Sequence, residues 1–303
     1  MDETDLILCR MLLTNSRTPY RVLADQLGIS VNAVHKRIQS MIESNIIRGF
    51  SAKPSIRALG LLRVFIHGYS KARPITDKIN ELHTRSEDIY WVAVCGGDYL
   101  YIGAYVRGLT KLNDIVTLVS DVLKIEDAQF GIIDHGYDPY SEKKENLEPI
   151  DWEIIYQLKD DSRLPISEVA NSVGVSARTA RRRLDRMMKN QLIELSIVWY
   201  PDSENDIISV FSVRSSQNKL NLFEFIKDYN PRIISCFGYH NIPKEYLVLS
   251  WSKTTSDMRE LYYRFEKDAR FSSVNSNIIY IGEIFPTWRD ILVENKGLIE
   301  PKS

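Results

Sequence analysis

The sequence predicts an α+β protein in which two helix-turn-helix units alternate with two βαββαβ units in tandem. Three observations lead to this fold class: the chain repeats itself, each repeat opens with three short helical patterns, and each continues with strand and helix patterns in alternation. The 303 residues exceed one ordinary domain. An apolar content of 44% and a charged content of 26% are typical of globular proteins that bury a core.

The repeat is exact in length over its first forty or so residues. Asp5 meets Asp151, a shift of 146 residues, and this shift lays "DLILCRMLLTNSRTPYRVLADQLGISVNAVHKRI" over "DWEIIYQLKDDSRLPISEVANSVGVSARTARRRL" without a gap. The identical pairs include Arg17 and Arg163, Pro19 and Pro165, Ala24 and Ala170, Gly28 and Gly174, Ser30 and Ser176, Arg37 and Arg183, Met41 and Met187, and Ile47 and Ile193. The chain is therefore a tandem duplication.

Each repeat begins with three predicted helices. In the first repeat, Pro19 separates the first helix from the second, because proline cannot continue a helix. The second helix, "YRVLADQLG", ends at Gly28, which suits the left-handed conformation that closes a helix. Ser30 can then accept a hydrogen bond from the free amides of the third helix. Because the turn between the second and third helices is so short, they must cross steeply, as in a helix-turn-helix motif.

The third helix of each repeat separates into an inward and an outward face. Apolar residues at helical spacing predict the inward face, which comprises Val31, Val34, Ile38 and Met41 in the first repeat and Ala177, Ala180, Leu184 and Met187 in the second. The outward positions hold Asn32, His35, Lys36 and Gln39 in the first repeat and Arg178, Arg181, Arg182 and Asp185 in the second. Five arginines thus fall between Arg178 and Arg186, although the formal net charge of the chain is only −1.

This face predicts contact with double-stranded DNA. Guanidinium groups bind phosphates or guanine, and amides such as those of Asn32 and Gln39 can bind adenine edges. A charge run on a helix is more often a solvated face, and it is the duplicated helix-turn-helix pattern that favours DNA. Arg37 and Arg183 lie at the flank of the core and are expected to pair with carboxylates instead. The predicted DNA-contacting residues are Ser30, Asn32, His35, Lys36, Gln39, Ser176, Arg178, Thr179, Arg181, Arg182 and Arg186.

The remainder of each repeat predicts a four-stranded antiparallel sheet with two helices on one face. The other face of such a sheet is bare and needs a partner, either the second repeat or another chain, and the sequence does not decide between them. We expect helix-turn-helix domains over 1–52 and 147–200, βαββαβ domains over 60–140 and 205–286, and a tail over 287–303. The tail predicts a short helix with Trp288, Ile291 and Leu292 on its buried side.

Several other classes of protein are not indicated. The apolar runs are too short to span a bilayer and the acidic start is not a signal peptide, so a cytoplasmic protein without membrane contact is expected. Phosphate-binding, dinucleotide-binding and nucleophile-elbow motifs are missing from the sequence, which predicts neither an enzyme nor a resident cofactor. Cys9, Cys95 and Cys236 are expected to be reduced thiols. The histidines His35, His67, His83, His135 and His240 have no metal-ligand spacing.

The residues resemble the Lrp/AsnC family of feast/famine transcription regulators. The resemblance rests on the opening helix-turn-helix pattern with Asp5, Arg17, Gly28 and Ser30, which recurs in the second repeat, and on "GGDYLY" in the first βαββαβ hairpin. It covers nearly the whole chain, twice over. It implies that the βαββαβ units are RAM domains, which pair sheet against sheet, form homo-oligomers and in many members bind an amino acid or small metabolite.

The resemblance also implies a ligand-binding loop formed by Gly96, Gly97, Asp98 and Tyr99. From the residues alone, the same segment is equally well explained as a tight hairpin turn. The second repeat reads "CFGYHNIPKEY", which keeps Gly238 but has no following aspartate and contains extra residues. The second repeat therefore departs from the ligand-loop pattern of the first.

Two alternatives come from other classes of function. Sirohaem decarboxylases share the two-part architecture and use histidine and arginine on tetrapyrrole carboxylates, and only His240 lies in a hairpin where such a residue would be expected. A corepressor-like protein that assembles with relatives and barely touches DNA is the second alternative. The outward arginines favour the DNA-binding regulator over both. Because the two heads carry different outward residues, the preferred DNA site is expected to be asymmetric.

Overall fold

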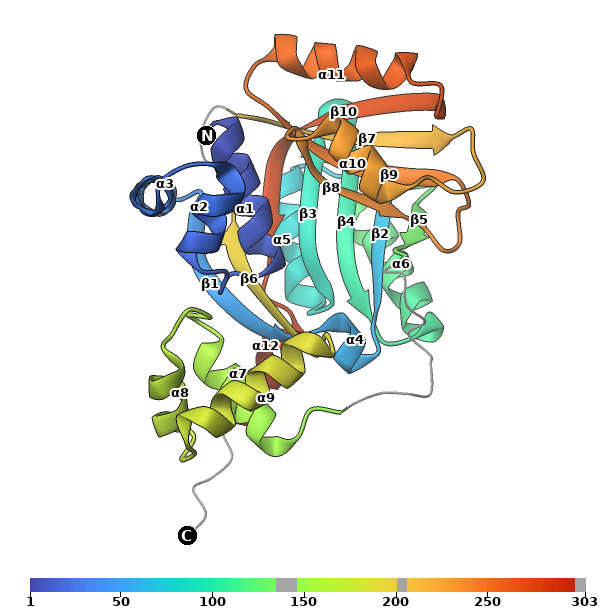
Figure 1. Ribbon diagram of the computed structural model, residues 1–303. Coiled ribbons are helices and arrows are strands. Elements are labelled where there is room, and N and C mark those ends of the chain that lie inside the picture. Colours follow the sequence, from blue (N-terminus) through green and yellow to red (C-terminus); the bar gives the residue numbers. More distant parts are fainter. Residues whose placement is uncertain (135–145, 201–205, 298–303) are drawn as a thin grey trace. The chain divides into compact units, whose positions relative to one another are not determined.

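The computed structural model describes residues 1–134, 146–200 and 206–297, which form two compact units (Figure 1). Unit one contains Met1–Gly60, Tyr140–Glu204 and Trp288–Ser303, and unit two contains Leu61–Pro139 and Asn205–Thr287. Each unit therefore combines segments of both repeats. The helix-turn-helix regions gather in unit one and the βαββαβ regions gather in unit two, in agreement with the predicted α+β fold class.

Unit one is built from two helical heads and a short ribbon of strands. The first head comprises α1 (Glu3–Thr14), α2 (Tyr20–Leu27) and α3 (Val31–Glu43), and the second comprises α7 (Pro149–Leu158), α8 (Ile166–Ser172) and α9 (Ala177–Lys189). The ribbon consists of β1 (Ile47–Pro54) and β6 (Ile193–Trp199). Two further helices are α4 (Ile56–Leu59) and α12 (Trp288–Gly297).

The glycine turns and serine caps predicted for the helices of the heads are confirmed. Gly28 ends α2 in the left-handed region at φ 66°, and Gly174 has φ 69° after α8. The hydroxyl group of Ser30 accepts a hydrogen bond from the amide of Ala33, and Ser176 caps α9 in the same way. The same residue types therefore form the same turn in both heads.

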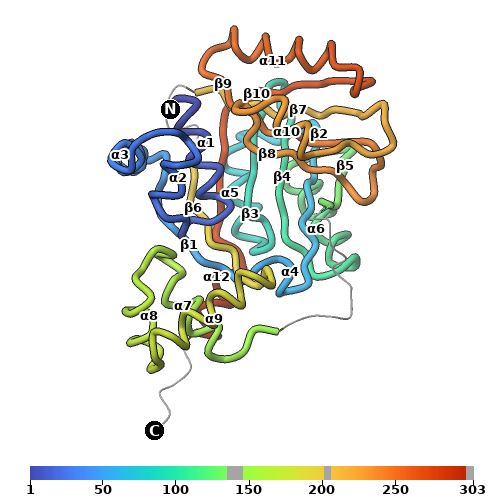
Figure 2. Tube along the Cα trace, in the orientation of Figure 1, coloured from blue at the N-terminus to red at the C-terminus, as the bar shows by residue number. Residues whose placement is uncertain are grey.

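The ribbon lies between the two heads (Figure 2), and its register is that of a local two-fold axis. Strands β1 and β6 pair antiparallel, with Phe50 opposite Ile197 and Ser51 opposite Ser196. Exchanging the repeats converts the first of these pairs into the second, because Ser51 corresponds to Ile197 and Phe50 to Ser196 under the shift between Asp5 and Asp151. The strand that follows each helix-turn-helix thus pairs with its counterpart from the other repeat.

The tail forms helix α12, which packs on α7 and β1. Arg289 is buried on this helix, and its guanidinium donates to the carbonyl oxygen of Pro54 at 2.6 Å and to the Glu194 carboxylate at 2.7 Å. Trp288 is buried as expected, but the prediction for Ile291 was wrong, because this side chain is exposed. The side chain of Val293 is buried against the second head.

Unit two contains eight strands in one antiparallel array. The first repeat supplies β2 (Leu62–Tyr69), α5 (Ile75–Arg85), β3 (Ile89–Cys95), the 3-10 turn η1 (Gly96–Asp98), β4 (Tyr99–Val106), α6 (Leu109–Leu123) and β5 (Gln129–Ile132). The second supplies β7 (Ile207–Ser215), α10 (Leu222–Tyr229), β8 (Ile233–Gly238), β9 (Glu245–Ser252), α11 (Thr255–Lys267) and β10 (Phe271–Ile284). The strand order is β5-β2-β4-β3-β10-β7-β9-β8.

The two sheets join at both of their edges. Strand β10 pairs with β3 of the other repeat from Ile279 to Ile284. At the opposite end of the array, a single bridge joins Ile133 to Tyr239, and the amide of His240 donates to the carbonyl oxygen of Ile132 at 2.8 Å. The array therefore closes on itself, with one long seam and one short seam.

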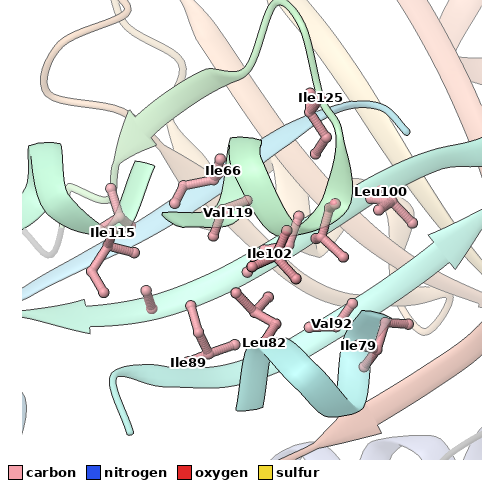
Figure 3. Packing of buried hydrophobic residues seen from close by; sticks show 14 of the residues in the cluster. Ile66, Ile79, Leu82, Ile89, Val92, Leu100, Ile102, Ile115, Val119 and Ile125 are labelled. Atoms are coloured by element: carbon pink, nitrogen blue, oxygen red, sulfur yellow. The ribbon is translucent and has the colours of Figure 1, made fainter. Parts of the chain in front are cut away.

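Two kinds of core follow from this closure. On the helix side of the first sheet, α5 and α6 cover a cluster of aliphatic residues that includes Ile66, Leu82, Ile102 and Val119 (Figure 3). The second kind lies between the two sheet faces and contains residues of both repeats, which are Phe65, Ala93, Cys95, Tyr101, Ile133, Val210 and Leu247. The bare faces left open by the sequence thus cover each other within one chain.

The layer between the sheet faces should carry much of the stability of unit two. Phe65 is 1% exposed and Phe223, on α10, is 78% exposed. We expect Phe65→Ala to lower the free energy of unfolding by about 3–5 kcal/mol, because the change removes a buried ring and leaves a cavity. The control Phe223→Ala should change it by less than about 0.5 kcal/mol. Urea unfolding measures both values, and equal effects of the two changes would contradict this role of the layer.

Candidate nucleic-acid interface

The outward face of α3 in the first head is polar and exposed. Asn32, His35, Lys36 and Gln39 all lie on the solvent side of the helix, as the sequence predicts. The ring of His35 packs edge-on against Tyr20 at 5.7 Å between ring centroids. This face therefore offers amide, imidazole and ammonium groups at helical spacing.

The outward face of α9 in the second head is strongly basic. Arg178, Arg181 and Arg182 are exposed, and within the described part of the chain none of them forms an ion pair with a carboxylate. Thr179 is half-buried, and its hydroxyl oxygen lies 3.0 Å from that of Ser176. Guanidinium groups without a carboxylate partner are suited to phosphate and to the guanine edge.

A second set of arginines braces each head from behind. Arg37 donates to Asp2 at 2.7 Å and to Asp5 at 2.8 Å, and Arg183 lies 2.7 Å from Glu148. These ion pairs confirm the bracing predicted for Arg37 and Arg183. They fasten the start of α1 to α3 and the start of α7 to α9; α3 and α9 are called the recognition helices below.

Arg186 differs from the exposed arginines with which the sequence grouped it. Its guanidinium is half-buried and lies 2.5 Å from the Asp151 carboxylate, whose side chain is fully buried. Arg186 thus belongs to the brace, together with Arg183. Sequence spacing could not place it there, because the depth of Asp151 depends on how α7 packs. A contact of Arg186 with DNA stays a prediction.

The ends of the recognition helices correct two further predictions. Val31 is 46% exposed and Ala177 is also exposed, although their spacing placed both on the inward face. Each is the first residue of its helix. The apolar face is buried only from Val34 and Ala180 onward, so the first residue of each helix does not take part in the packing.

The "GGD" segment of unit two forms the hairpin turn between β3 and β4. Gly97 and Asp98 lie in the left-handed region at φ 67° and 62°, and both are exposed. Asp98 pairs with Arg73, and its carbonyl oxygen accepts a hydrogen bond from the amide of Ser70. A Cβ atom on Gly96 would lie 3.5 Å from the ring of Tyr280. The loop is thus an accessible turn with a carboxylate and an aromatic ring beside it.

Behind this turn lies a cluster of polar side chains that the sequence pattern did not reveal. The hydroxyl oxygen of Tyr99 is 2.7 Å from Nδ1 of His67, and Asn277 of the other repeat donates to the hydroxyl oxygen of Tyr101 at 3.3 Å. Burial lowers the pKa of His67 to about 4, and burial also raises the pKa of Tyr99 to about 12. The alternation along β2 could have indicated His67, since it shares a face with Phe65.

The second hairpin has a different role. The extra residues after Gly238 pair with β5, and the side chain of Asn241 accepts from the amide of Ile132 and donates to the carbonyl oxygen of Phe130. His240 is exposed, and its Nε2 lies 3.4 Å from the Asp134 carboxylate. This loop is used to close the short seam, whereas the loop at Gly97 is not.

Other predicted features can be placed briefly. Cys9, Cys95 and Cys236 are buried and form no disulfide. In the part of the chain that the structure describes, no group of three His, Cys, Asp or Glu side chains could hold a metal ion; His135 lies outside that part. No described helix is both long and apolar enough to cross a membrane.

Comparison with known proteins agrees with this organisation. The sequence profile of winged helix-turn-helix DNA-binding domains matches residues 1–48 and 147–194, one match in each head. The regulator LrpA of Pyrococcus horikoshii is 31% identical over 121 residues, which are 39% of this chain and 84% of that protein. The regulator LysM of Sulfurisphaera tokodaii is 28% identical over 126 residues, which are 42% of this chain and 87% of that protein.

One solved structure has the whole architecture. The siroheme decarboxylase NirDL aligns with 97% of this chain and 98% of its own length at a TM-score of 0.59, with 14% identity. At this identity the likeness establishes the fold alone. The fold and the exposed heads define a tandem helix-turn-helix protein. The matches to LrpA and to the winged helix-turn-helix profile place the chain in the Lrp/AsnC family of transcriptional regulators.

The brace should contribute unequally to the two heads. Asp151 is fully buried between Arg183 and Arg186, whereas the side chain of Asp5 is 15% exposed beside Arg37. We expect Asp151→Ala to lower the free energy of unfolding by about 3–5 kcal/mol, because two arginines lose a buried partner. Asp5→Ala should cost less, since water screens the remaining charge. Urea unfolding with the exposed Asp185→Ala as control tests this order, and a reversed order would refute it.

Burial of neutral His67 should make unit two less stable in acid. Its pKa is lowered from 6.5 to about 4 in the folded chain, so the unfolded chain binds more protons between these values and stability falls as the pH drops through this window. Between pH 7 and pH 5 the loss attributable to His67 should be about 2 kcal/mol. His67→Gln should remove it, whereas the exposed control His35→Gln should not. Equal pH dependence of both variants in urea unfolding would refute this assignment.

Proposed function

We propose that this regulator reads DNA with two unlike heads carried by one chain. The observation that supports the proposal is the set of exposed guanidinium groups of Arg178, Arg181 and Arg182 on the outward face of α9. They lie on the helix that enters the major groove in helix-turn-helix proteins. The duplicated head supplies a second reading helix, α3, in the same compact unit.

The two heads contribute differently to DNA binding. The arginines of α9 supply most of the attraction to phosphates, which depends strongly on salt. Asn32 and Gln39 of α3 carry little charge and can form paired hydrogen bonds with adenine. A site with two different half-sites follows from this difference. Ser30 and Ser176 cap the recognition helices, and phosphates close to those helix ends are a suitable contact for them.

An effector at Gly96, Gly97, Asp98 and Tyr99 is the second part of the proposal. The turn is exposed and contains a carboxylate, which suits an amino acid or a related small metabolite. Such an effector changes DNA affinity only as far as it binds two arrangements of the protein unequally. Since the corresponding loop of the second repeat pairs with β5, one effector site per chain is expected.

Oligomer formation through the sheet faces, as predicted from the sequence, would compete with the pairing inside the chain. Phe65 and Val210 from the two repeats share one buried layer, so those faces are already covered. A single chain therefore suffices as the reading unit. A homo-oligomer would have to use another surface. We expect such a regulator to be located in the cytoplasm and to have no enzymatic activity.

Removal of the three exposed arginines tests the DNA-binding role of α9. We expect the triple change of Arg178, Arg181 and Arg182 to alanine to abolish tight binding. The slope of log affinity against log salt should fall by about 2.7, or 0.9 for each phosphate that the variant no longer neutralises. Fluorescence anisotropy with a labelled duplex from upstream of the gene, against a scrambled duplex, measures both.

A matched control removes the same charge elsewhere. The triple change of Lys111, Lys227 and Lys267 to alanine also deletes three exposed positive charges, but in unit two. It should leave the salt slope within about 0.5 of the wild-type value. Circular dichroism establishes that both variants are folded. Equal affinity of the wild type and the arginine variant would refute the assignment of α9.

The tetrapyrrole enzyme is the alternative that the fold favours, because NirDL shares the architecture over nearly its whole length. A corepressor-like assembly partner is the other. If the wild-type protein binds neither duplex at low salt, the DNA-binding proposal fails and the enzyme and corepressor alternatives gain support. Absorbance titration with an iron tetrapyrrole then separates them, since only the enzyme should bind it and take up its colour.

A further inference from the structure

The two heads meet at four polar residues, Ser16, Arg17, Ser162 and Arg163, which we call the head clamp. The hydroxyl oxygens of Ser16 and Ser162 lie 2.5 Å apart, and both serines are fully buried. These serines are separated by 146 residues, the same shift that relates the repeats. The local two-fold axis of the ribbon therefore also passes between the two hydroxyl groups.

The arginines of the clamp cross this axis. Arg17 donates to the carbonyl oxygens of Ser162 at 2.6 Å and Leu164 at 2.8 Å. Arg163 donates to those of Ser16 at 2.8 Å and Thr18 at 3.4 Å. Arg17 therefore holds the loop that precedes α8 in the second head, and Arg163 holds the loop that precedes α2 in the first head.

The chemistry of the clamp is better suited to fixing the relative orientation of the two heads than to only holding them together. Burial lowers the pKa of Arg17, and the nearby positive charges of Arg163 and Arg181 act in the same direction, whereas Asp161 opposes them. Like charges close together are an unfavourable way to hold two surfaces, and apolar residues would do so at lower cost. A planar guanidinium that spans two carbonyl oxygens, however, fixes direction as well as distance. The guanidinium of Arg163 also lies 4.4 Å from the ring centre of Tyr20.

We propose that the head clamp sets the distance and rotation between recognition helices α3 and α9, so that the protein selects DNA sites by the spacing of their half-sites. Arg17 and Arg163 act as positioning residues, because they hold loops that precede α2 and α8. The effect on DNA rests on the proposed function. The clamp itself is a property of the free protein and can be tested without DNA.

Charge-retaining substitution separates position from attraction. Lysine keeps the positive charge of Arg17 and Arg163 but lacks the planar fork that spans two carbonyl oxygens. The double variant R17K/R163K should therefore loosen the heads and keep the phosphate attraction. Arg21→Lys, an exposed arginine of α2, is the matched control. The single variants R17K and R163K replace the double variant if thermal melting by circular dichroism shows that it does not fold.

Distance measurement between spin labels tests the clamp in the absence of DNA. The substitutions Gln39→Cys and Asp185→Cys place labels at exposed, repeat-related positions of α3 and α9, and the three natural cysteines are buried. We expect a narrow distribution of label distances in the parent and control proteins. R17K/R163K should broaden it about twofold, because heads without the guanidinium forks can adopt a wider range of arrangements. An unchanged width in every folded lysine variant would overturn the clamp.

Spacing of the half-sites tests the consequence for DNA. Duplexes selected by the wild-type protein from a random pool are compared with versions that carry inserts up to about 5 bp, which is half a helical turn. The longest insert should weaken wild-type binding at least about tenfold and R17K/R163K binding less than about threefold, with the salt slope unchanged. Equal spacing selectivity in both proteins would overturn the proposal. If the wild type selects no duplex, the proposed function fails together with the spacing role, and the label distances still decide on the clamp.

Discussion

A four-stranded sheet with helices on only one face must find cover for its other face, and this constraint organises unit two. Apolar side chains line the open faces, among them Phe65, Phe237 and Leu247. Tandem duplication places both open faces in one chain, which makes their association intramolecular and independent of protein concentration. Closure at two seams also removes the free strand edges through which sheets aggregate.

Covering each face with an unlike copy allows the two copies to differ. The long seam is a strand pairing between β10 and β3, whereas the short seam depends on Tyr239 and Asn241 from the lengthened second hairpin. One hairpin therefore became part of the closure and the other, at Gly97, stayed an accessible turn. The heads diverged in the same manner, with the brace kept in both and the outward faces changed. A homodimer of identical chains could not separate these roles.

Local features were predictable from the sequence, and features that depend on packing depth were not. Caps such as Ser30 and turns such as Gly28 follow from residue type and spacing, so they were found correctly. Val31 was misplaced because periodicity does not show at which residue the packing of a helix begins, and Arg186 because the burial of its partner Asp151 is a tertiary property. The choice between pairing inside and between chains requires the complementarity of two surfaces, which no single repeat contains. In the sequence, Arg17 and Arg163 were recognised only as an identical pair at corresponding positions of the two repeats.

The clamp and the unlike heads together have a consequence for the direction of binding. A symmetric dimer on a palindromic site has no preferred direction, because exchanging its subunits restores the same complex. In this chain, exchange of the heads would place the arginines of α9 where α3 offers Asn32 and Gln39, and the two complexes would differ in energy. Flexible tethering would let each head choose its half-site separately and would weaken this difference. Heads held together by Arg17 and Arg163 must choose jointly, so a difference between half-sites becomes a difference between orientations of the whole regulator.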